Sequence, residues 1–255
     1  MIKEQRLSMI VNYLVAHGTA TLAELAELNG VSVDTVRNDL TELESVNLGV
    51  KRVRGGAVFH DGDKTKQPFS VRNVENKEKK LSLAKLVTDL VVDGQSVALN
   101  NGTTNVAIAK HLAEQFRHLT IVTNSLKIAQ VFSTVNSNHV IIVSGTLDHS
   151  ESSIYGTHCE QEILNYNIDV AILAINSISL ERGITDFRVN EEGVLRAMLQ
   201  TSRKVYVAAD STKFDRIACV NICPLERISG IITDGDLAED IYQKYIDAGV
   251  NVIRP

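Results

Sequence analysis

Hydrophobic positions in the first 45 residues recur with the period of an α-helix. The first predicted helix ends near Gly18, and its apolar stripe consists of Leu7, Ile10, Val11, Leu14 and Val15. A second helix begins at the capping-box sequence Thr21 to Glu24 and ends at Asn29-Gly30. A third begins after the cap residue Ser32 and runs to about Leu43, with Val36, Leu40 and Leu43 inward and Asp34, Asn38 and Thr41 outward.

The second and third helices, with the tight turn Asn29-Gly30-Val31 between them, predict a helix-turn-helix. Ala26 and Gly30 are small residues at the place where the two helices must approach. Residues 46–59 predict two short strands broken at Gly55-Gly56, with a cluster of cations at Lys51, Arg52 and Arg54. Residues 1–60 are therefore expected to form a winged helix-turn-helix domain with a basic wing.

The rest of the chain follows a different pattern. Residues 61–80 are polar and predict a linker that merges into a helix. Strands are predicted at residues 96–99, 120–123, 140–143, 170–175, 204–209, 229–233 and 251–253, and helices at 104–116, 126–132, 191–201 and 237–248. This alternation predicts that residues 81–255 form a second domain of the α/β class, with a parallel sheet covered by helices.

The composition is that of a globular protein. Of the 255 residues, 44% are hydrophobic and 22% are charged. The longest apolar stretch, Val170 to Ile175, is far shorter than the roughly 18 residues that a membrane-spanning helix needs. The amino terminus lacks the features of a signal peptide, and three cysteines are too few for a disulfide scaffold. We therefore expect a cytoplasmic protein with small buried thiols, no cofactor and no metal site.

The placement of charge is more informative than its sum. The net charge of −5 is unfavourable for binding nucleic acid, and residues 1–60 carry 6 Lys+Arg against 7 Asp+Glu, a net of −1. Four of these six cations, however, are Arg37 on the third helix and Lys51, Arg52 and Arg54 on the wing. Their positions indicate DNA binding even though the net charge does not.

The third helix and the wing supply the candidate DNA contacts. Asn38 is suited to an adenine edge and Arg37 to a guanine or a phosphate, while the wing cations suit phosphates or the minor groove. The candidates are Ser32, Asp34, Thr35, Arg37, Asn38, Thr41, Lys51, Arg52 and Arg54. The alternative is that these helices are an ordinary packing unit and that the cations only solvate an acidic domain.

Polar residues follow several predicted strands of the second domain. Asn100 to Thr104 comes after a strand and opens a helix, where backbone N–H groups and hydroxyls suit a phosphate. Because ligands of open α/β sheets bind at the carboxyl ends of strands, we expect one effector pocket. Its candidate residues are Asn101, Gly102, Thr103, Thr104, Asn124, Ser144, Gly145, Thr146, Asn176, Glu191, Asp210 and Lys213. The alternative is a set of ordinary capped turns.

Seven motifs occur in a characteristic order: Val31 to Leu40, Arg54 to Ala57, Asn101 to Thr104, Val122 to Ser125, Ser144 to Leu147, Arg182 to Thr185 and Asp210 to Phe214. In this order they resemble the DeoR-type transcriptional regulators over nearly the whole chain. The resemblance implies a winged-helix DNA reader joined to a sensor domain similar in fold to ribose-5-phosphate isomerase. It also implies a phosphorylated sugar or sugar alcohol as effector, and repression of genes of carbohydrate uptake and catabolism.

The sequence departs from the family pattern at four positions. Asn38 stands where a second arginine is common, Asn100 where an aspartate is usual and Ser144 where glycine is usual. Asn176 lies in the segment where the isomerases keep a catalytic carboxylate, and an amide cannot act as a general base. Because a winged helix reads a short site, we also expect a homo-oligomer, a dimer or a tetramer, on double-stranded operator DNA.

Three other hypotheses stay open. A sugar-phosphate isomerase would move a proton with a carboxylate, for which Asp169, Asp186, Glu191 and Asp210 are candidates. A metal site would use His158, Cys159, Cys219 and Cys223, whose spacing is not that of a structural zinc site. The third is a protein-interaction module whose winged helix has lost DNA binding. The order of motifs favours a regulator without catalytic residues, with the isomerase as the main alternative.

Overall fold

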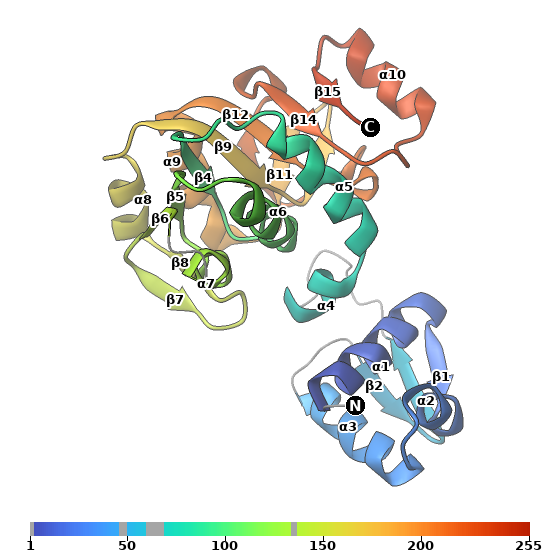
Figure 1. Ribbon diagram of the computed structural model, residues 1–255. Coiled ribbons are helices and arrows are strands. Elements are labelled where there is room, and N and C mark those ends of the chain that lie inside the picture. The colour runs from blue at the N-terminus through green and yellow to red at the C-terminus, as the bar shows by residue number, and fades with distance from the viewer. Residues whose placement is uncertain (1–2, 46–49, 60–68, 134–136) are drawn as a thin grey trace. The chain divides into compact units, whose positions relative to one another are not determined.

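The computed structural model describes residues 3–45, 50–59, 69–133 and 137–255, and the chain divides into two compact units, Met1–Glu75 and Asn76–Pro255 (Figure 1). The first unit contains α1 (Lys3–His17), β1 (Thr19–Thr21), α2 (Leu22–Asn29), α3 (Val33–Ser45), β2 (Val50–Val53), β3 (Gly56–Phe59) and α4 (Phe69–Val74). Its strands form a small antiparallel sheet in the order β1-β3-β2. The predicted helix-turn-helix is therefore present, and the strands beside it form the wing.

The helices of the first unit form because their apolar stripes meet in one core. Ile10, Leu14, Leu25, Val36 and Leu40 are completely buried there. The predicted capping box at Thr21 and Glu24 is present, with both of its hydrogen bonds. Gly30 ends α2 as predicted, with φ at +63°, which favours glycine. Its second predicted role, the close approach of two helices, was wrong, because a Cβ there would meet nothing within 4 Å.

Two features of this unit were not predicted. β1 has three residues, too few to show an alternating pattern, and it forms by pairing with β3. Of the expected linker, residues 61–68 lie outside the described residues, as do residues 46–49 of the expected wing. The rest of the expected linker is largely helical: α4 was not predicted, whereas α5 (Lys77–Thr88), in the second unit, is the helix into which the linker was expected to merge.

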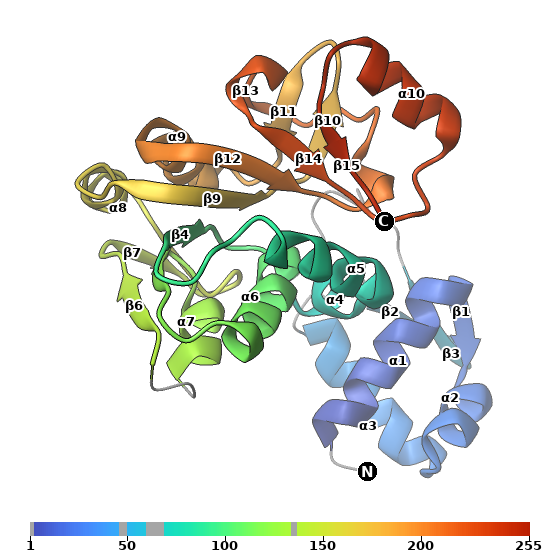
Figure 2. The same cartoon turned by 45° about the horizontal axis from the view of Figure 1, so that its top comes forward.

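The second unit is built on seven parallel strands in the order β15-β14-β12-β9-β4-β5-β6 (Figure 2). Their bounds are β4 (Ser96–Leu99), β5 (Thr120–Thr123), β6 (His139–Ile142), β9 (Ile168–Ala174), β12 (Ser202–Ala208), β14 (Gly230–Ile232) and β15 (Val252–Ile253). All seven predicted strands and the parallel α/β class are thus confirmed. The central part of the sheet is apolar because both of its faces are covered: β9 is buried over nearly its whole length and β12 over its last four residues.

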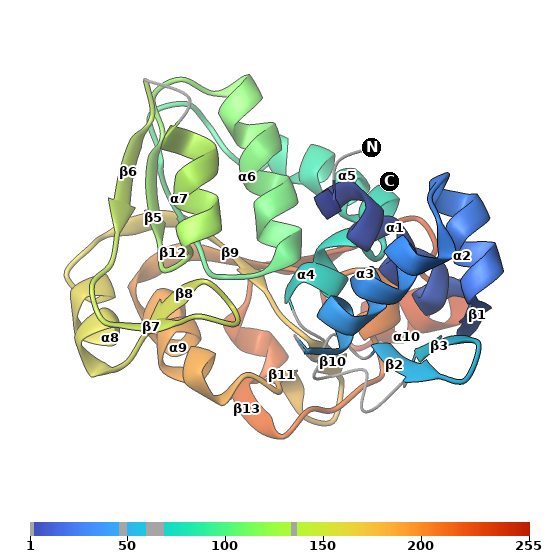
Figure 3. The ribbon, with the colours of Figure 1, turned by 90° about the horizontal axis from the view of Figure 1, so that it is seen from below.

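Helices lie on both faces of this sheet. In the views of Figures 2 and 3, α5, α6 (Thr103–Gln115) and α7 (Leu126–Ser133) cover one face, and α8 (Thr157–Ile163) and α9 (Glu192–Thr201) lie on the other. α10 (Glu239–Asp247) precedes β15. The core includes Ile172, Leu173, Val207 and Met198, all completely buried.

Smaller β elements were absent from the prediction. β10 (Ser177–Ser179), β11 (Gly183–Asp186) and β13 (Val220–Cys223) form an antiparallel sheet, and β7 (Thr146–Asp148) pairs with β8 (Ser153–Tyr155). Each has three or four residues, and β13 pairs with a strand far away in sequence, so no local pattern marks it. These elements carry the loops that surround the carboxyl edge of the main sheet.

The strand order defines one special place on the sheet. From β4 the chain proceeds outward through β5 to β6, and then returns to the opposite side of β4 with β9. The carboxyl ends of β4 and β9 therefore lie where the order reverses. In open parallel sheets this reversal leaves a crevice in which ligands bind.

Candidate functional site

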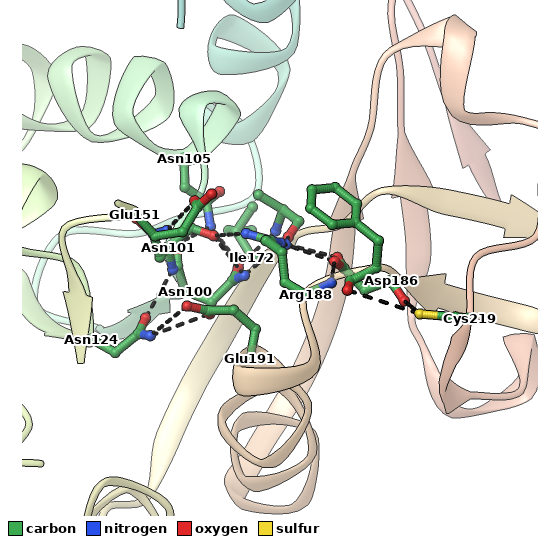
Figure 4. Close-up of polar contacts among 12 residues, drawn as sticks. Asn100, Asn101, Asn105, Asn124, Glu151, Ile172, Asp186, Arg188, Glu191 and Cys219 are labelled. Carbon is green, nitrogen blue, oxygen red and sulfur yellow. Dashed lines mark hydrogen bonds and ion pairs between the residues drawn. The ribbon is translucent and has the colours of Figure 1, made fainter. Parts of the chain in front are cut away.

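Four asparagines meet at the carboxyl ends of β4 and β5 (Figure 4). Asn100 and Asn101 follow β4, Asn105 lies in the first turn of α6, and Asn124 follows β5; all four are completely buried. Buried amides are stable only when they are hydrogen-bonded, so their partners define the local structure. We call these residues, together with Asp186, Arg188 and Glu191, the polar cluster.

Asn100 and Asn105 join β4 to β9. Asn100 Nδ2 donates to the Ala174 carbonyl at 3.0 Å, and the Ala174 N–H donates to Asn100 Oδ1 at 2.8 Å. Asn105 Nδ2 donates to the carbonyls of Asn100 at 2.9 Å and of Ile172 at 2.8 Å. Asn105 Oδ1 is buried and, among the described residues, accepts no hydrogen bond. The two side chains thus hold the reversal point of the sheet together from within.

Asn101 and Asn124 connect this point to a buried carboxylate. The Asn101 N–H donates to Asn124 Oδ1 at 2.8 Å, and Asn124 Nδ2 lies 3.2 Å from both carboxylate oxygens of Glu191. Asn101 Nδ2 donates to Glu151 at 3.1 Å, and Ser125 Oγ donates to Asn101 Oδ1 at 3.0 Å. Burial raises the pKa of Glu191 to about 7, although the Arg188 charge and hydrogen bonds from Ser153 and Asn124 oppose this shift.

Arg188 is the buried cation of the cluster. Its Nη1 donates to the Asn101 carbonyl at 2.7 Å and its Nη2 to the Ala174 carbonyl at 3.0 Å, while Nε and Nη2 bind the Asp186 carboxylate at 2.9 and 2.7 Å. Burial alone would lower the pKa of Arg188, but the Asp186 carboxylate raises it above its ordinary value. Arg188 was not predicted as a site residue. Asp186 was considered only as a candidate carboxylate of an isomerase. Their Asp-Phe-Arg spacing gives no sign that both are buried.

The amino terminus of α6 lies against the end of β9. A Cβ on Gly102 would be 2.6 Å from the Ala174 Cβ, so glycine is required for this approach. No side chain of the described residues caps this helix, and its first hydrogen bond runs from the Val106 N–H to the Gly102 carbonyl. The N–H groups at Thr103 to Asn105 are therefore available at the positive end of the helix.

Other predicted effector residues lie on the same edge with different partners. Ser144 follows β6 and its Oγ donates to Glu162 at 2.6 Å; Gly145 and Thr146 come next and are exposed. Asn176 follows β9 and is 9% exposed. Asp210 precedes the short 3-10 turn η3 (Ser211–Lys213) after β12 and Lys213 is its last residue; Asp210 Oδ1 accepts the Thr212 N–H. Hydrogen bonds join Asn101, Asn124 and Glu191 directly. The three loops after β6, β9 and β12 are connected to them only through the sheet.

A second ionic group lies beside η3 and was not predicted. Lys79 Nζ in α5 donates to Ser211 Oγ at 2.7 Å and lies 3.0 Å from Asp236 and 3.5 Å from the buried Asp234. Burial lowers the pKa of Lys79, but the aspartates raise it more, so that its pKa is above the ordinary value. The lysine thus ties the start of α5 to the loops after β12 and β14.

In the first unit, the predicted DNA-contact residues lie on the exposed side of α3 and on the wing. Arg37 Nη1 is 2.6 Å from Asp34 Oδ1, and both side chains are more than half exposed. Ser32 Oγ accepts the Thr35 N–H at 3.2 Å, which confirms the predicted cap. Asn38, Lys51 and Arg54 are exposed.

Arg52 connects the wing to α3. Its Nη1 donates to Thr41 Oγ1 at 2.7 Å, and the Thr41 hydroxyl donates to the Arg37 carbonyl at 2.8 Å. The Arg52 N–H also donates to Glu44 at 3.1 Å. A further pair, Arg6 and the buried Asp39, joins α1 to α3 through two hydrogen bonds, at 2.5 and 3.0 Å. α3 is therefore fixed both to α1 and to the wing.

The prediction that the cysteines are buried was only partly right. Cys159 is completely buried, whereas Cys223 is half-buried and Cys219 is exposed, because it precedes β13 at the rim of the small sheet. Within the described ranges, no three His, Cys, Asp or Glu residues are grouped as metal ligands. Among these residues there is also no helix with the length and hydropathy needed to cross a membrane.

Two family models match the chain, one for each unit. The model of a DeoR-like helix-turn-helix domain matches residues 6–62, and that of the DeoR C-terminal sensor domain matches residues 75–235. The transcriptional repressor AccR of Agrobacterium fabrum is 33% identical, over 91% of this chain and 89% of the relative. The repressor GlcR of Bacillus subtilis is 32% identical over 92% and 89%. The glycerol-3-phosphate regulon repressor of Escherichia coli K12 is 29% identical over 97% of both chains.

Among solved structures, the second unit is similar to ribose 5-phosphate isomerase A of Methanocaldococcus jannaschii. The TM-score is 0.41 at 14% identity, over 55% of both chains. The isomerase determined with phospho-erythronic acid gives a TM-score of 0.42 at 15% identity, over 54% of both chains.

Proposed function

Since the chain belongs to the DeoR family of transcriptional regulators, we propose that it represses genes of carbohydrate uptake or catabolism and releases or binds its operator in response to a phosphorylated sugar or polyol. The observation that carries the effector half is the uncapped amino terminus of α6 beside the polar cluster. The N–H groups of the helix can donate to a phosphate. The amides and carboxylates of the cluster can bind hydroxyl groups.

In this proposal the phosphate binds at Gly102, Thr103 and Thr104. The glycine lets the helix end approach β9, and the helix dipole favours an anion there. The sugar hydroxyls bind Asn101, Asn124 and Glu191, whose oxygens and nitrogens converge on the carboxyl edge of the sheet. This placement puts the ligand where the strand order reverses, the position at which ligands of open parallel sheets bind.

The remaining candidate effector contacts lie around this position. Asp210 and Lys213 follow β12, the strand beside β9, and Asn176 follows β9 itself, so all three lie on the edge that the phosphate would occupy. Ser144, Gly145 and Thr146 follow β6 at the other end of the edge. We assign the first three to the far side of the ligand and the last three to a closing loop.

The DNA half of the proposal rests on the first unit. α3 presents Arg37 and Asn38 to the major groove, with Asp34 and Thr41 beside them and Ser32 and Thr35 at its start, while Lys51, Arg52 and Arg54 of the wing contact phosphates. A short recognition site requires at least a dimer for useful specificity. The protein would therefore act in the cytoplasm, as a homo-oligomer on repeated half-sites.

The test is a fluorescence-anisotropy titration of the purified protein with its own upstream DNA and with a scrambled duplex. A panel of phosphorylated sugars and polyols is added, each beside its unphosphorylated parent. We expect selective binding to the upstream DNA that one phosphorylated compound changes and its parent does not. Weak, equal binding to both duplexes with every ligand would overturn the proposal.

Variants locate the effector site. Thr103→Ala and Glu191→Gln are expected to abolish the ligand response while leaving the ligand-free DNA affinity within about twofold, since both residues belong to the second unit and the proposed DNA contacts to the first. Gly235→Ala is the matched control, because a Cβ there meets nothing within 4 Å. A normal response in both site variants would place the effector elsewhere.

One observation also suits an isomerase. A carboxylate whose pKa is near 7, as burial produces for Glu191, is the kind of general base that moves a proton next to a carbonyl. The other candidate carboxylates fit less well: Asp186 is held by Arg188, and Asp169 at the start of β9 accepts hydrogen bonds from Ser96, at the opposite end of the strand. Turnover of an aldose phosphate that Glu191→Gln abolishes would favour the enzyme.

A further inference from the structure

The first turns of α3 contain an arrangement of charges that simple phosphate binding does not explain. Asp34 is 83% exposed and lies on the same side of α3 as Arg37, so a DNA duplex bound along this side would meet a carboxylate. A carboxylate beside phosphates weakens binding, and the unit has no excess of cations to compensate for it. The Asp34 side chain is therefore unfavourable for affinity unless it does something for recognition.

The geometry suggests what it does. Asp34 Oδ1 accepts one hydrogen bond from Arg37 Nη1 at 2.6 Å. A guanidinium has five N–H donors in a rigid plane, so a carboxylate on one nitrogen fixes the direction of the plane and leaves other donors for a second partner. Bidentate donation from an arginine to O6 and N7 of guanine requires such a fixed plane.

The backbone beneath this pair is also fixed. The Ser32 hydroxyl caps the helix at Thr35, and the Thr41 hydroxyl, held by Arg52 of the wing, donates to the Arg37 carbonyl. Arg37 is thus held at its side chain by Asp34 and at its carbonyl by Thr41. An arginine that contacts only phosphate gains little from such restraint, because phosphate contacts tolerate many orientations.

Building on the proposed DNA binding, we propose that Asp34 is a positioning residue that orients Arg37 toward a single guanine of the operator. Asp34 lowers the affinity for DNA in general and increases the discrimination at that one base pair. The pair thereby lowers the affinity for any DNA sequence and raises the preference for one base. This agrees with the net charge of −1, which already makes non-specific DNA binding by this unit weak.

The test begins with duplexes that the full-length wild-type protein selects from a random pool, each base pair of which is then varied singly. Arg37→Lys keeps the charge but not the planar fork, and it identifies the base pair that Arg37 reads. At that base pair, Asp34→Ala is expected to lose about tenfold of the preference for guanine and to keep the preferences elsewhere. Its affinity for a scrambled duplex at low salt should rise by about two- to threefold.

Two further variants separate position from charge. Asp34→Asn keeps an oxygen that accepts from Arg37 but removes the charge, so it should raise the non-specific affinity like Asp34→Ala while retaining most of the guanine preference. Glu27→Ala removes an exposed carboxylate from α2 and should leave the guanine preference unchanged. Circular dichroism melts confirm that all variants are folded.

The outcomes distinguish this inference from the function on which it rests. If the wild type selects no sequence, the proposed DNA recognition fails, and the role of Asp34 fails with it. If the wild type is selective but Asp34→Ala keeps the full preference for guanine, or weakens every duplex by the same factor, the pair is an ordinary surface ion pair and the positioning role is wrong.

Discussion

Arg188 and Asp186 face each other through two parallel hydrogen bonds, at 2.9 and 2.7 Å, with both side chains at most 8% exposed. The same guanidinium also donates to carbonyls at the ends of β4 and β9. One buried cation therefore holds three segments of the chain, at Asn101, Ala174 and Asp186. The stability of the carboxyl edge depends on this charge being matched.

Arg188→Met is expected to destabilise the second unit by about 3–5 kcal/mol, because it leaves the Asp186 carboxylate buried without a cation. The double variant Asp186→Leu/Arg188→Met should recover part of the loss. Urea denaturation followed by circular dichroism measures both. Arg182→Ala, which breaks an exposed pair with Glu181, is the control and should change stability by less than about 1 kcal/mol. A loss as small as that of the control would contradict the structural role of Arg188.

The raised pKa of Glu191 predicts how stability depends on pH. Between the ordinary pKa of 4.5 and the folded value of about 7, the folded protein keeps a proton that the unfolded chain has lost. Stability from this group should therefore be highest below pH 4.5, fall as the pH rises to 7, and then stay constant. The total is on the order of 3 kcal/mol.

The measurement compares wild type and Glu191→Gln, because other carboxylates also titrate in this range. The amide stays neutral, so the variant should gain stability relative to the wild type from pH 5 to pH 8. Parallel stability curves would show that the Glu191 carboxylate is ionised at both values of pH.

Gly102→Ala should separate α6 from β9, since the new methyl group would lie 2.6 Å from Ala174 Cβ. We expect a loss of about 1–3 kcal/mol of stability and a weaker response to effector. Hydrogen exchange of the first turn of α6 would show the displacement directly. With Gly235→Ala as the control, equal exchange rates in both variants would mean that the loop accommodates a side chain.

Lys79→Met tests the ionic group around η3. The change leaves the buried Asp234 near Asp210 and Asp236 without the cation, so the free energy of unfolding should fall by about 1–3 kcal/mol and the first turn of α5 should exchange faster. Lys85→Met, at an exposed position of the same helix, should have little effect. If both variants behave alike, the group contributes no more than an ordinary surface charge.

The sequence predicted the main sheet well because its strands are runs of buried apolar residues, as at Val170 to Ile175, that end at turn residues. It did not predict β10, β11 or β13, which have only three or four residues; β10 and β11 form a short hairpin, and β13 pairs with β11 from a distant part of the sequence. Asn101 and Asn124 were found because they follow strands. Arg188 was not found, because a charged residue in a polar segment is expected to be exposed. Only the folded structure shows that the Arg188 side chain is buried against the sheet.

The same distinction holds in the first unit. The capping residues Thr21 and Ser32 were predicted, because a cap is formed within one turn of the chain. The link from Arg52 to Thr41 was not, because it joins positions 11 residues apart on different elements. Spacing along a helix could have indicated the Asp34 and Arg37 pair, since residues three apart are neighbours.

The hydrogen bonds around Asn101 also bear on the chemical lifetime of the protein. Asn101 precedes Gly102, and in a flexible chain the nitrogen after such an asparagine readily attacks the side-chain amide, which leads to deamidation. Here the Asn101 side-chain amide donates to Glu151 and accepts from Ser125, and these two hydrogen bonds restrain it from turning toward the attacking Gly102 nitrogen. Deamidation would place a second carboxylate beside Glu151, and the native fold therefore protects the loop between β4 and α6 against this chemical ageing.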